Sequence, residues 1–342
     1  MASVAAPQPL ERGDGSLEAF YAVTAETREA ADGGPSILHA IGNTPLVELR
    51  RIVPKNSARV VVKLESANPT GSMKDRLARQ VIQCAVDAGE LKPGGTVVEY
   101  TAGAMGISLA FVASAQGYRT HIVFSDAFSD EKRLAMLAYG AEISDVPSVN
   151  KRITTELIRA MIAKAAEISQ RSGHWWADQL NNENGAEGYA GLGEEIWTQT
   201  NGEVDALVHS VGTAHSLLGT ARALRRHRAD LPVFAVEPFE SPVLSGWPPG
   251  SHKIEGVGVG FIPPLWNRSE VDKILSVSTN DAKQMARDLA REEAIFAGTS
   301  TGANVVAALR VAAWLGPGKT VATIVVDSGL RYVSTDVFRP PG

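Results

Sequence analysis

The chain of 342 residues contains a single cysteine, Cys84. One thiol cannot form an internal disulfide, so disulfide-stapled secreted folds are excluded and a cytoplasmic location is expected. No uncharged apolar run is long enough to span a bilayer, and we expect no membrane partner. Residues 1–16 lack a basic start followed by an apolar core, which argues against a secretory or transit peptide.

Basic patches and metal-ligand spacings are also lacking. The net charge is -5 and the pI about 5.9, and without a basic patch no nucleic-acid partner is expected. The seven histidines show no metal-ligand spacing, and HExxH and paired CxxC motifs are missing, so no metal is expected. A content of 44% hydrophobic and 21% charged residues is typical of a globular protein with one large or two medium domains.

Short apolar runs alternate with helical periodicity along most of the chain. A first series predicts strands at 59–64, 96–100, 120–124 and 142–146, with helices at 107–116 and 130–139. A second series predicts strands at 206–211, 233–237 and 320–326, with helices at 214–227, 281–293 and 303–315. This alternation favours an α/β fold of two doubly wound lobes, with parallel sheets covered on both faces. Ligands in such folds bind beyond the carboxyl ends of the strands.

Lys74 stands where a turn-rich stretch, 68–72, passes into an amphipathic helix predicted from Asp75 to Leu91. The macrodipole disfavours a cation at a helix start, which would lower the pKa of the lysine and favour a nucleophilic amine. Such an amine can form a Schiff base with an aldehyde. The alternative is an ordinary surface lysine on a first helical turn.

The sequence around this lysine matches a known motif. Asn-Pro-Thr-Gly-Ser-Met-Lys-Asp-Arg stands complete at 68–76, and Ile-Gly-Asn-Thr-Pro-Leu-Val precedes it at 41–47. These segments resemble the cysteine synthase and cystathionine β-synthase family of fold-type II, tryptophan synthase β-like pyridoxal 5'-phosphate (PLP) enzymes. The resemblance runs from about residue 37 to residue 335. It implies a homodimer in which Lys74 holds PLP in a cleft between the two lobes.

The resemblance also implies domain bounds. Residues 68–183 would form the smaller, mobile lobe, and residues 37–67 together with 184–339 the larger, cofactor-binding lobe. Residues 1–36 mix proline, glycine and acidic residues with one short helical pattern at 17–31, and we expect a partly disordered arm.

A strand, a glycine turn and a helix start follow one another around residue 212, an arrangement that can bind an anion through backbone N–H groups. The turn aligns with the family's Gly-Thr-Gly-Gly-Thr phosphate cup. Cofactor-binding roles are thereby implied for Gly212, Thr213, Ala214, His215 and Ser216. Ser216 keeps a hydroxyl, whereas Ala214 and His215 add bulk. His215 is either a phosphate contact or a surface helix residue.

Ser328 follows the last predicted strand. The two-residue period of a strand sends Asp327 and Ser328 to opposite faces, so only one can face the cofactor. By resemblance, Ser328 is the hydrogen-bond partner of the pyridine nitrogen. A neutral hydroxyl there leaves the ring unprotonated, which suits loss of a β-leaving group.

The loop at 101–106 matches the family's clamp for the substrate α-carboxylate, which usually contains Thr-Ser-Gly-Asn-Thr-Gly. Three polar side chains of that pattern are replaced, by Ala102, Ala104 and Met105. Each lost hydrogen bond would weaken binding by roughly 1.5–3 kcal/mol. Substrate-binding roles are implied for Thr101, Ala102, Gly103, Ala104, Met105, Gln179 and Gly256; Gln179 is otherwise a polar loop residue.

The resemblance implies β-replacement on an activated serine or related β-substituted amino acid. Lys74 would act as general base, and a small nucleophile, sulfide or another, would add to an aminoacrylate intermediate. Two alternatives stay open. One is β-elimination, which gives pyruvate and ammonia. The other is a catalytically impaired relative that acts by binding, which the altered loop at 101–106 would favour.

Overall fold

The computed structural model describes residues 36–151 and 153–339. The predicted arm and its helical pattern therefore lie outside the described residues, apart from Ser36. Short 3-10 helices punctuate the fold: η1 (Ile37–Ala40), η2 (Glu65–Ala67), η3 (Glu183–Gly185), η4 (Glu187–Tyr189), η5 (Val243–Ser245), η6 (Arg268–Glu270) and η7 (Gly329–Tyr332). No helix within the described ranges is long and apolar enough to cross a membrane.

Six strands form the larger sheet, in the order β1-β2-β10-β7-β8-β9. Their bounds are β1 (Leu46–Glu48), β2 (Arg59–Leu64), β7 (Ala206–Ser210), β8 (Val233–Pro238), β9 (Lys273–Val277) and β10 (Thr320–Val325). Neighbouring strands run parallel except at one edge, where β1 pairs antiparallel with β2. The parallel arrangement predicted from the buried apolar runs is confirmed, with one antiparallel edge strand.

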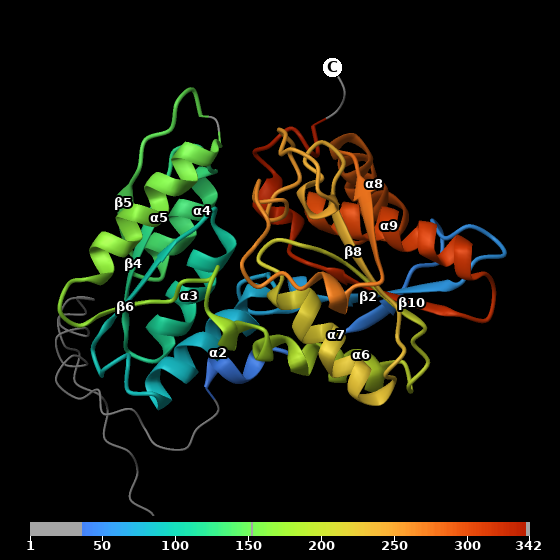
Figure 1. Ribbon diagram of the computed structural model, residues 1–342, viewed down its shortest axis with the longest axis horizontal. Helices are drawn as coiled ribbons and strands as arrows, with labels where there is room; N and C mark the ends of the chain where they lie inside the picture. The colour runs from blue at the N-terminus through green and yellow to red at the C-terminus, as the bar shows by residue number, and fades with distance from the viewer. Residues whose placement is uncertain (1–35, 152, 340–342) are drawn as a thin grey trace, which may run out of the picture. The chain divides into compact units, whose positions relative to one another are not determined.

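Helices cover both faces of this sheet, as predicted. Figure 1 shows α8 (Thr279–Glu292) and α9 (Thr299–Leu315) on one side of β2 and β10, and α6 (Ala190–Gln199) and α7 (His215–His227) on the other. The strand period of two divides the apolar side chains between the faces. Val321 and Val325 of β10 pack with α8 and α9, whereas Ala322 and Ile324 pack with α6 and α7.

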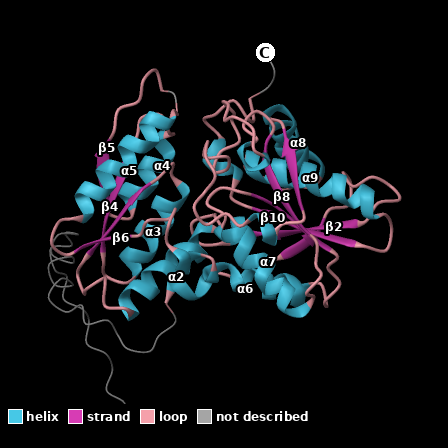
Figure 2. Ribbon diagram, in the orientation of Figure 1, coloured by secondary structure: helices cyan, strands magenta, loops and turns pink. Residues whose placement is uncertain are grey.

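The smaller sheet is fully parallel, in the order β5-β4-β3-β6. Its strands are β3 (Thr96–Tyr100), β4 (Arg119–Phe124), β5 (Glu142–Asp145) and β6 (His174–Trp176), and its helices are α2 (Lys74–Asp87), α3 (Ala104–Ala115), α4 (Asp130–Ala138) and α5 (Thr155–Ser169). Figure 2 shows these strands among their helices. The strands fall within the range expected for the smaller lobe, and the lobe bounds and mobility stay predictions.

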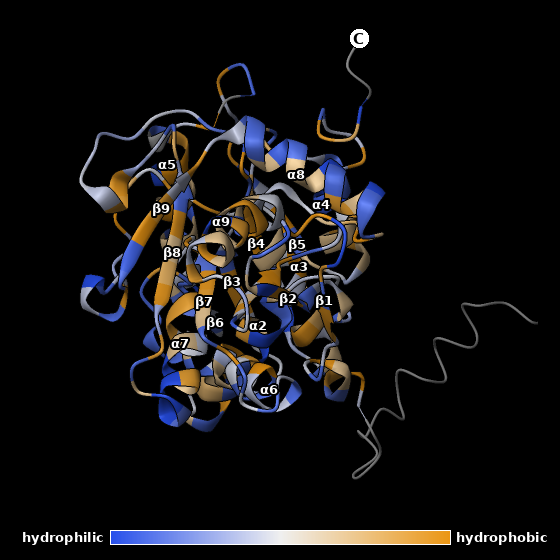
Figure 3. Cartoon of the chain, turned by 90° about the vertical axis from the view of Figure 1, so that its right-hand side faces the viewer, coloured by the Kyte–Doolittle hydropathy of each residue, from blue (hydrophilic) through white to orange (hydrophobic). Residues whose placement is uncertain are grey.

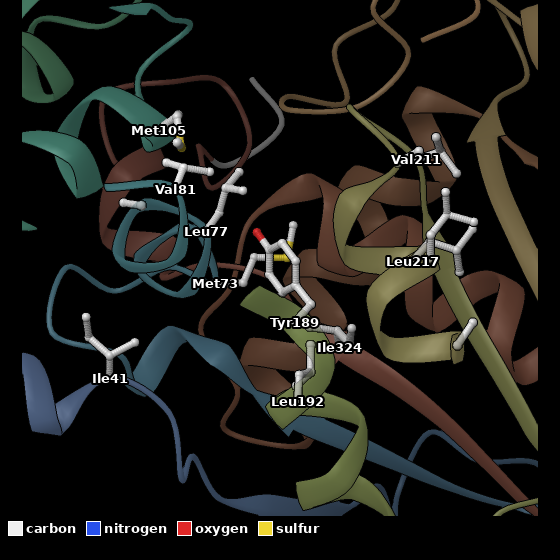
Figure 4. Packing of buried hydrophobic residues seen from close by; sticks show 14 of the residues in the cluster. Ile41, Met73, Leu77, Val81, Met105, Tyr189, Leu192, Val211, Leu217 and Ile324 are labelled. Carbon is white, nitrogen blue, oxygen red and sulfur yellow. The ribbon is translucent and has the colours of Figure 1, made fainter. Parts of the chain in front are cut away.

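One apolar cluster connects the two sheets through α2. Leu77 and Val81 of α2 belong to the same cluster as Val97 of β3 and Ile324 of β10. Figure 4 shows Leu77 and Val81 near Met105, with Tyr189 and Ile324 beyond them. In Figure 3 the strands are predominantly hydrophobic, whereas α8 is hydrophilic along most of its length. The cluster thus packs α2, whose first residue is Lys74, against both sheets.

Candidate functional site

Lys74 is the first residue of α2, one residue before the predicted start. Its side chain is half-buried, and its Nζ makes no hydrogen bond or ion pair with any described residue. Burial lowers the pKa of this amine to about 8. The direction agrees with the sequence-based expectation, which attributed it to the helix dipole, and the structure adds burial as a cause. Lys74 is therefore a half-buried amine with a lowered pKa and not an ordinary surface lysine.

Asp75 fixes the loop that leads into the lysine. Its carboxylate accepts hydrogen bonds from the backbone N–H of Thr70 (2.8 Å), the Thr70 hydroxyl (2.5 Å) and the Ser108 hydroxyl (2.6 Å). The Thr70 carbonyl accepts a further bond from Arg331 (2.6 Å). Asp75 thus joins the lysine loop to α3 and orients the start of α2.

Arg76 belongs to a buried cluster of four charges. Its guanidinium donates two hydrogen bonds to Glu65 (2.7 and 2.8 Å) and two to Glu195 (both 2.8 Å), and Glu195 also pairs with Lys63 (2.7 Å). Burial alone would raise the pKa of Glu195, but its bonds to Arg76 and Lys63 hold that pKa at about 2. A cavity of about 340 Å³ lies beside this cluster and is lined by Arg76, Glu195 and Arg79. None of the predicted site residues lines it. Arg76 therefore has a structural role.

The turn between β7 and α7 has the geometry of an anion site. Ala214 adopts a left-handed conformation with φ of 74°, so successive N–H groups converge. No described residue accepts a hydrogen bond from the N–H groups of residues 212–217. A Cβ at Gly212 would lie 2.4 Å from the carbonyl oxygen of Gly256, so only glycine fits there. Gly256 therefore lies against the predicted phosphate loop.

Two buried histidines support this loop. His215 is 1% exposed, so the surface alternative for it is wrong; its ring contacts the Thr213 hydroxyl (2.8 Å) and the Asn182 carbonyl (2.9 Å). Sequence reasoning missed His209, which is fully buried on β7 and contacts the Ser216 hydroxyl (2.8 Å). A histidine inside an apolar strand was the available signal. The charge of Lys74 acts on both rings, so the amine and the loop are close together.

Ser328 lies beside the lysine loop. Its N–H donates to the Gly71 carbonyl (2.9 Å), and a Cβ at Gly71 would lie 3.4 Å from the Cβ of Ser328. Its hydroxyl oxygen accepts from the Leu330 N–H (3.3 Å), which leaves the hydroxyl proton available. Asp327 is buried and accepts from the Tyr332 hydroxyl (2.7 Å). The two side chains thus have different environments.

The loop at 101–106 differs from the sequence-based expectation. Helix α3 begins at Ala104, not at Ile107, so half of the loop belongs to its first turn. The Thr101 hydroxyl is occupied within the loop, where it accepts from the N–H groups of Gly103 (2.9 Å) and Gly106 (3.3 Å). The Met105 side chain is 2% exposed and packs in the core.

Three backbone donors of this loop are free within the part of the chain that the structure describes. The N–H groups of Ala102, Ala104 and Met105 have no acceptor among the described residues. Gln179 lies nearby, because its side-chain amide donates to the Tyr100 carbonyl (3.1 Å) directly before the loop. Gln179 lies in a turn, as the alternative of a polar loop residue requires, and it is 9% exposed.

Lys132 of α4, which sequence reasoning missed, links this loop to the segment that contains Gly256. Its Nζ forms an ion pair with Glu255, and it lies 5.6 Å from the ring centroid of Tyr332. A Cβ at Gly103, whose φ is +132°, would lie 2.3 Å from Cδ of Lys132. No local motif marks Lys132, because its partners come from distant parts of the chain.

Comparison with known proteins agrees with this arrangement. A family model described as "Pyridoxal-phosphate dependent enzyme" matches residues 37–327. The chain belongs to this family. A cysteine synthase of Staphylococcus aureus is 41% identical over 305 residues, which cover 89% of this chain and 96% of that protein.

Solved structures extend the likeness to the whole fold. An O-acetylserine sulfhydrylase isoform 3 from Entamoeba histolytica has a TM-score of 0.83 and 34% identity, covering 99% of this chain and 96% of its own. An O-ureido-L-serine synthase has a TM-score of 0.83 and 36% identity, covering 90% and 95%. The sequence resemblance implied the fold class, the family and dependence of the enzyme on PLP, and all three predictions are confirmed.

The described residues fit this cofactor. A half-buried amine without a partner can hold an aldehyde, and six consecutive N–H groups without acceptors can hold a phosphate. The roles of the individual residues stay predictions.

Proposed function

We propose that this PLP enzyme catalyses β-replacement on an activated L-serine such as O-acetylserine, with Lys74 as the catalytic residue. The observation that carries the proposal is the Lys74 amine, which is free of partners among the described residues and has a pKa of about 8. PLP, when bound, supplies an electron sink for charge at Cα. An amine with that pKa can hold the cofactor and then accept and return the Cα proton near neutral pH.

The other residues would bind and orient. The N–H groups of residues 212–217 would hold the cofactor phosphate, together with the hydroxyls of Thr213 and Ser216. The Ser328 hydroxyl, whose proton is available, would donate to the ring nitrogen and leave the ring unprotonated. The N–H groups of Ala102, Ala104 and Met105, with Gln179, would hold the substrate carboxylate.

The nucleophile would be small. Sulfide is the first candidate, because the Staphylococcus aureus relative is a cysteine synthase. The similar O-ureido-L-serine synthase supports a wider search among small nucleophiles. Ala104 also supports a nucleophile other than sulfide. Its half-buried methyl group cannot make the hydrogen bonds of the asparagine amide that the family places at this position. We further propose that the protein acts as a cytoplasmic homodimer, as the sequence resemblance implies.

The test is a spectral titration of the purified protein with O-acetyl-L-serine and other β-substituted serines and cysteines, followed by product analysis. With sulfide or another nucleophile present, a new amino acid should form faster than pyruvate. Lys74→Ala should abolish the spectral change, whereas Lys164→Ala, which alters a half-buried lysine of α5 that pairs with Glu167, should not. Pyruvate as the main product with every nucleophile would favour β-elimination instead.

A further inference from the structure

Two buried histidines each contact one hydroxyl of the proposed phosphate loop. His209 Nε2 lies 2.8 Å from Ser216 Oγ, and His215 Nδ1 lies 2.8 Å from Thr213 Oγ1. A phosphate dianion can only accept hydrogen bonds, so a hydroxyl contributes to its binding only if its proton is available. The direction of the two histidine bonds therefore decides which hydroxyl can bind phosphate.

The bond between His209 and Ser216 has a fixed direction. Asn304 accepts the Ser210 N–H through Oδ1 (2.7 Å), so its Nδ2 group must face His209 Nδ1 (3.1 Å). An NH₂ group only donates, and Nδ1 of His209 must therefore be unprotonated. The proton of the neutral ring lies on Nε2 and is donated to Ser216. Ser216 keeps its own proton for a ligand.

The bond between His215 and Thr213 has the opposite direction in the neutral ring. His215 Nε2 faces the Asn182 carbonyl (2.9 Å), which can only accept, so Nε2 carries the proton. Nδ1 is then bare, and Thr213 must donate its only hydroxyl proton to it. In this state Thr213 cannot donate to a phosphate.

Protonation of His215 would reverse that bond without breaking either contact. The imidazolium donates from Nε2 to the Asn182 carbonyl and from Nδ1 to Thr213 Oγ1. The Thr213 proton then becomes free for the ligand. His209 cannot change in this way, because a proton on Nδ1 would face the Nδ2 hydrogens of Asn304.

His215 is neutral in the free protein. Burial, and after it the charge of Lys74 on α2, lower its pKa to about 4. Glu183 on η3, Glu187 and Tyr189 on η4 and His209 on β7 also lie on elements around it, and they are not among the causes of this lowered pKa. A bound dianion acts in the opposite sense, because negative charge raises the pKa of a nearby imidazole.

We propose that His215 is a positioning residue which takes up a proton from solvent when a phosphate monoester binds, and so frees the hydroxyl proton of Thr213 for donation to the phosphate. This inference rests on the proposed phosphate site of the cofactor. The complex then holds one more proton than the free protein over the pH range between the two pKa values of His215. Affinity for the phosphate group should therefore rise as the pH falls toward 7.

Calorimetry of the apoenzyme with pyridoxine 5'-phosphate tests this directly, because that probe has no aldehyde to react with Lys74. Titrations at pH 7 in buffers of different protonation enthalpy measure the protons taken up. A phosphate pKa of about 6 and a Lys74 pKa of about 8 each contribute only roughly 0.1 proton at this pH. We expect uptake of between about 0.5 and 1 proton in the wild type.

His215→Gln should reduce the uptake to below about 0.2 proton, because the amide can donate to Asn182 but does not titrate. His227→Gln, the same change at the exposed last turn of α7, should leave the uptake unchanged. Nitrogen-15 NMR of the wild-type histidines gives a second measurement. The probe should convert His215 to the imidazolium and leave His209 neutral.

Binding of the probe without proton uptake, or with a neutral His215, would overturn this inference while the cofactor site stands. Full uptake in His215→Gln would overturn it as well. No binding of the probe at all would overturn the proposed phosphate site, and the inference with it.

Discussion

Replacing Arg76 with methionine should destabilise the fold strongly while Lys74 keeps its reactivity. The guanidinium is 4% exposed and makes four hydrogen bonds to two carboxylates, of which Glu65 is fully buried. Methionine fills a similar volume but cannot donate. The variant would bury two carboxylates against Lys63 alone, which leaves one negative charge uncompensated.

The magnitude follows from that imbalance. Removing one partner of a buried ion pair costs about 3–5 kcal/mol. An unfolding entropy of about 2.1 cal/mol/K per residue gives about 0.6 kcal/mol/K for roughly 300 residues, so a loss of about 4 kcal/mol lowers Tm by about 6 °C. A loss of about 4 kcal/mol exceeds the roughly 0–1 kcal/mol that an exposed ion pair contributes.

Urea unfolding of single and double variants is the assay. Adding Glu65→Gln to Arg76→Met restores the charge balance, so the double variant should lose at least about 1 kcal/mol less than the sum of the single losses. Arg79→Met is the matched control, because Arg79 is exposed on the same helix and its hydrogen bond to the Leu38 carbonyl is long (3.4 Å). Additive losses, or an equal loss in Arg79→Met, would refute the reasoning.

Borohydride treatment of the yellow protein should fix PLP on the peptide that contains Lys74, and label on another lysine would overturn that assignment. Ser328→Ala should keep PLP bound but slow turnover, because the ring nitrogen loses its donor; unchanged kinetics would exclude this role. Ala104→Asn should shift the ratio of kcat/KM values toward sulfide by up to about tenfold, or about 1.4 kcal/mol. Met105→Thr should only lower stability, because Met105 is buried. Glu195 has a folded pKa of about 2 against an ordinary 4.5, so its stabilisation is present above pH 4.5 and lost as the pH falls toward 2. Glu195→Gln should flatten this part of a urea-unfolding profile, and an unchanged profile would contradict the assignment of this acid-sensitive stabilisation to Glu195.

Much of the fold could be predicted from the sequence because buried strands and amphipathic helices leave strong local patterns. The strands at 59–64 and 96–100 match β2 and β3 residue for residue. Helix α6 was missed, since Gly191 and Gly193 lower its helix propensity. Tertiary packing decides there: a Cβ at Gly193 would lie 2.6 Å from the Cβ of Ala223 on α7.

The candidate site divides in a similar way. Its lysine and its loops follow from contiguous motifs, which the sequence displays directly. The partners of those residues come from far along the chain, as when Asn304 fixes the ring of His209 or Lys132 packs on Gly103. The direction of a side chain is also hidden, and so Met105 was expected at the substrate and lies in the core.

The contacts of the first turn of α2 constrain the number of residues in the segment that leads into it. Successive residues of a helix point about 100° apart, and in this turn Asp75 and Arg76 contact different partners. Asp75 is bonded to Thr70 and Ser108, and Arg76 to the carboxylates of Glu65 and Glu195, and together these contacts set the orientation of the turn from which Lys74 projects. An inserted or deleted residue between 68 and 76 would rotate the amine away from the 212–217 loop even if every side chain were kept. The number of residues in this stretch should therefore be as strictly required as the side chains of Lys74, Asp75 and Arg76.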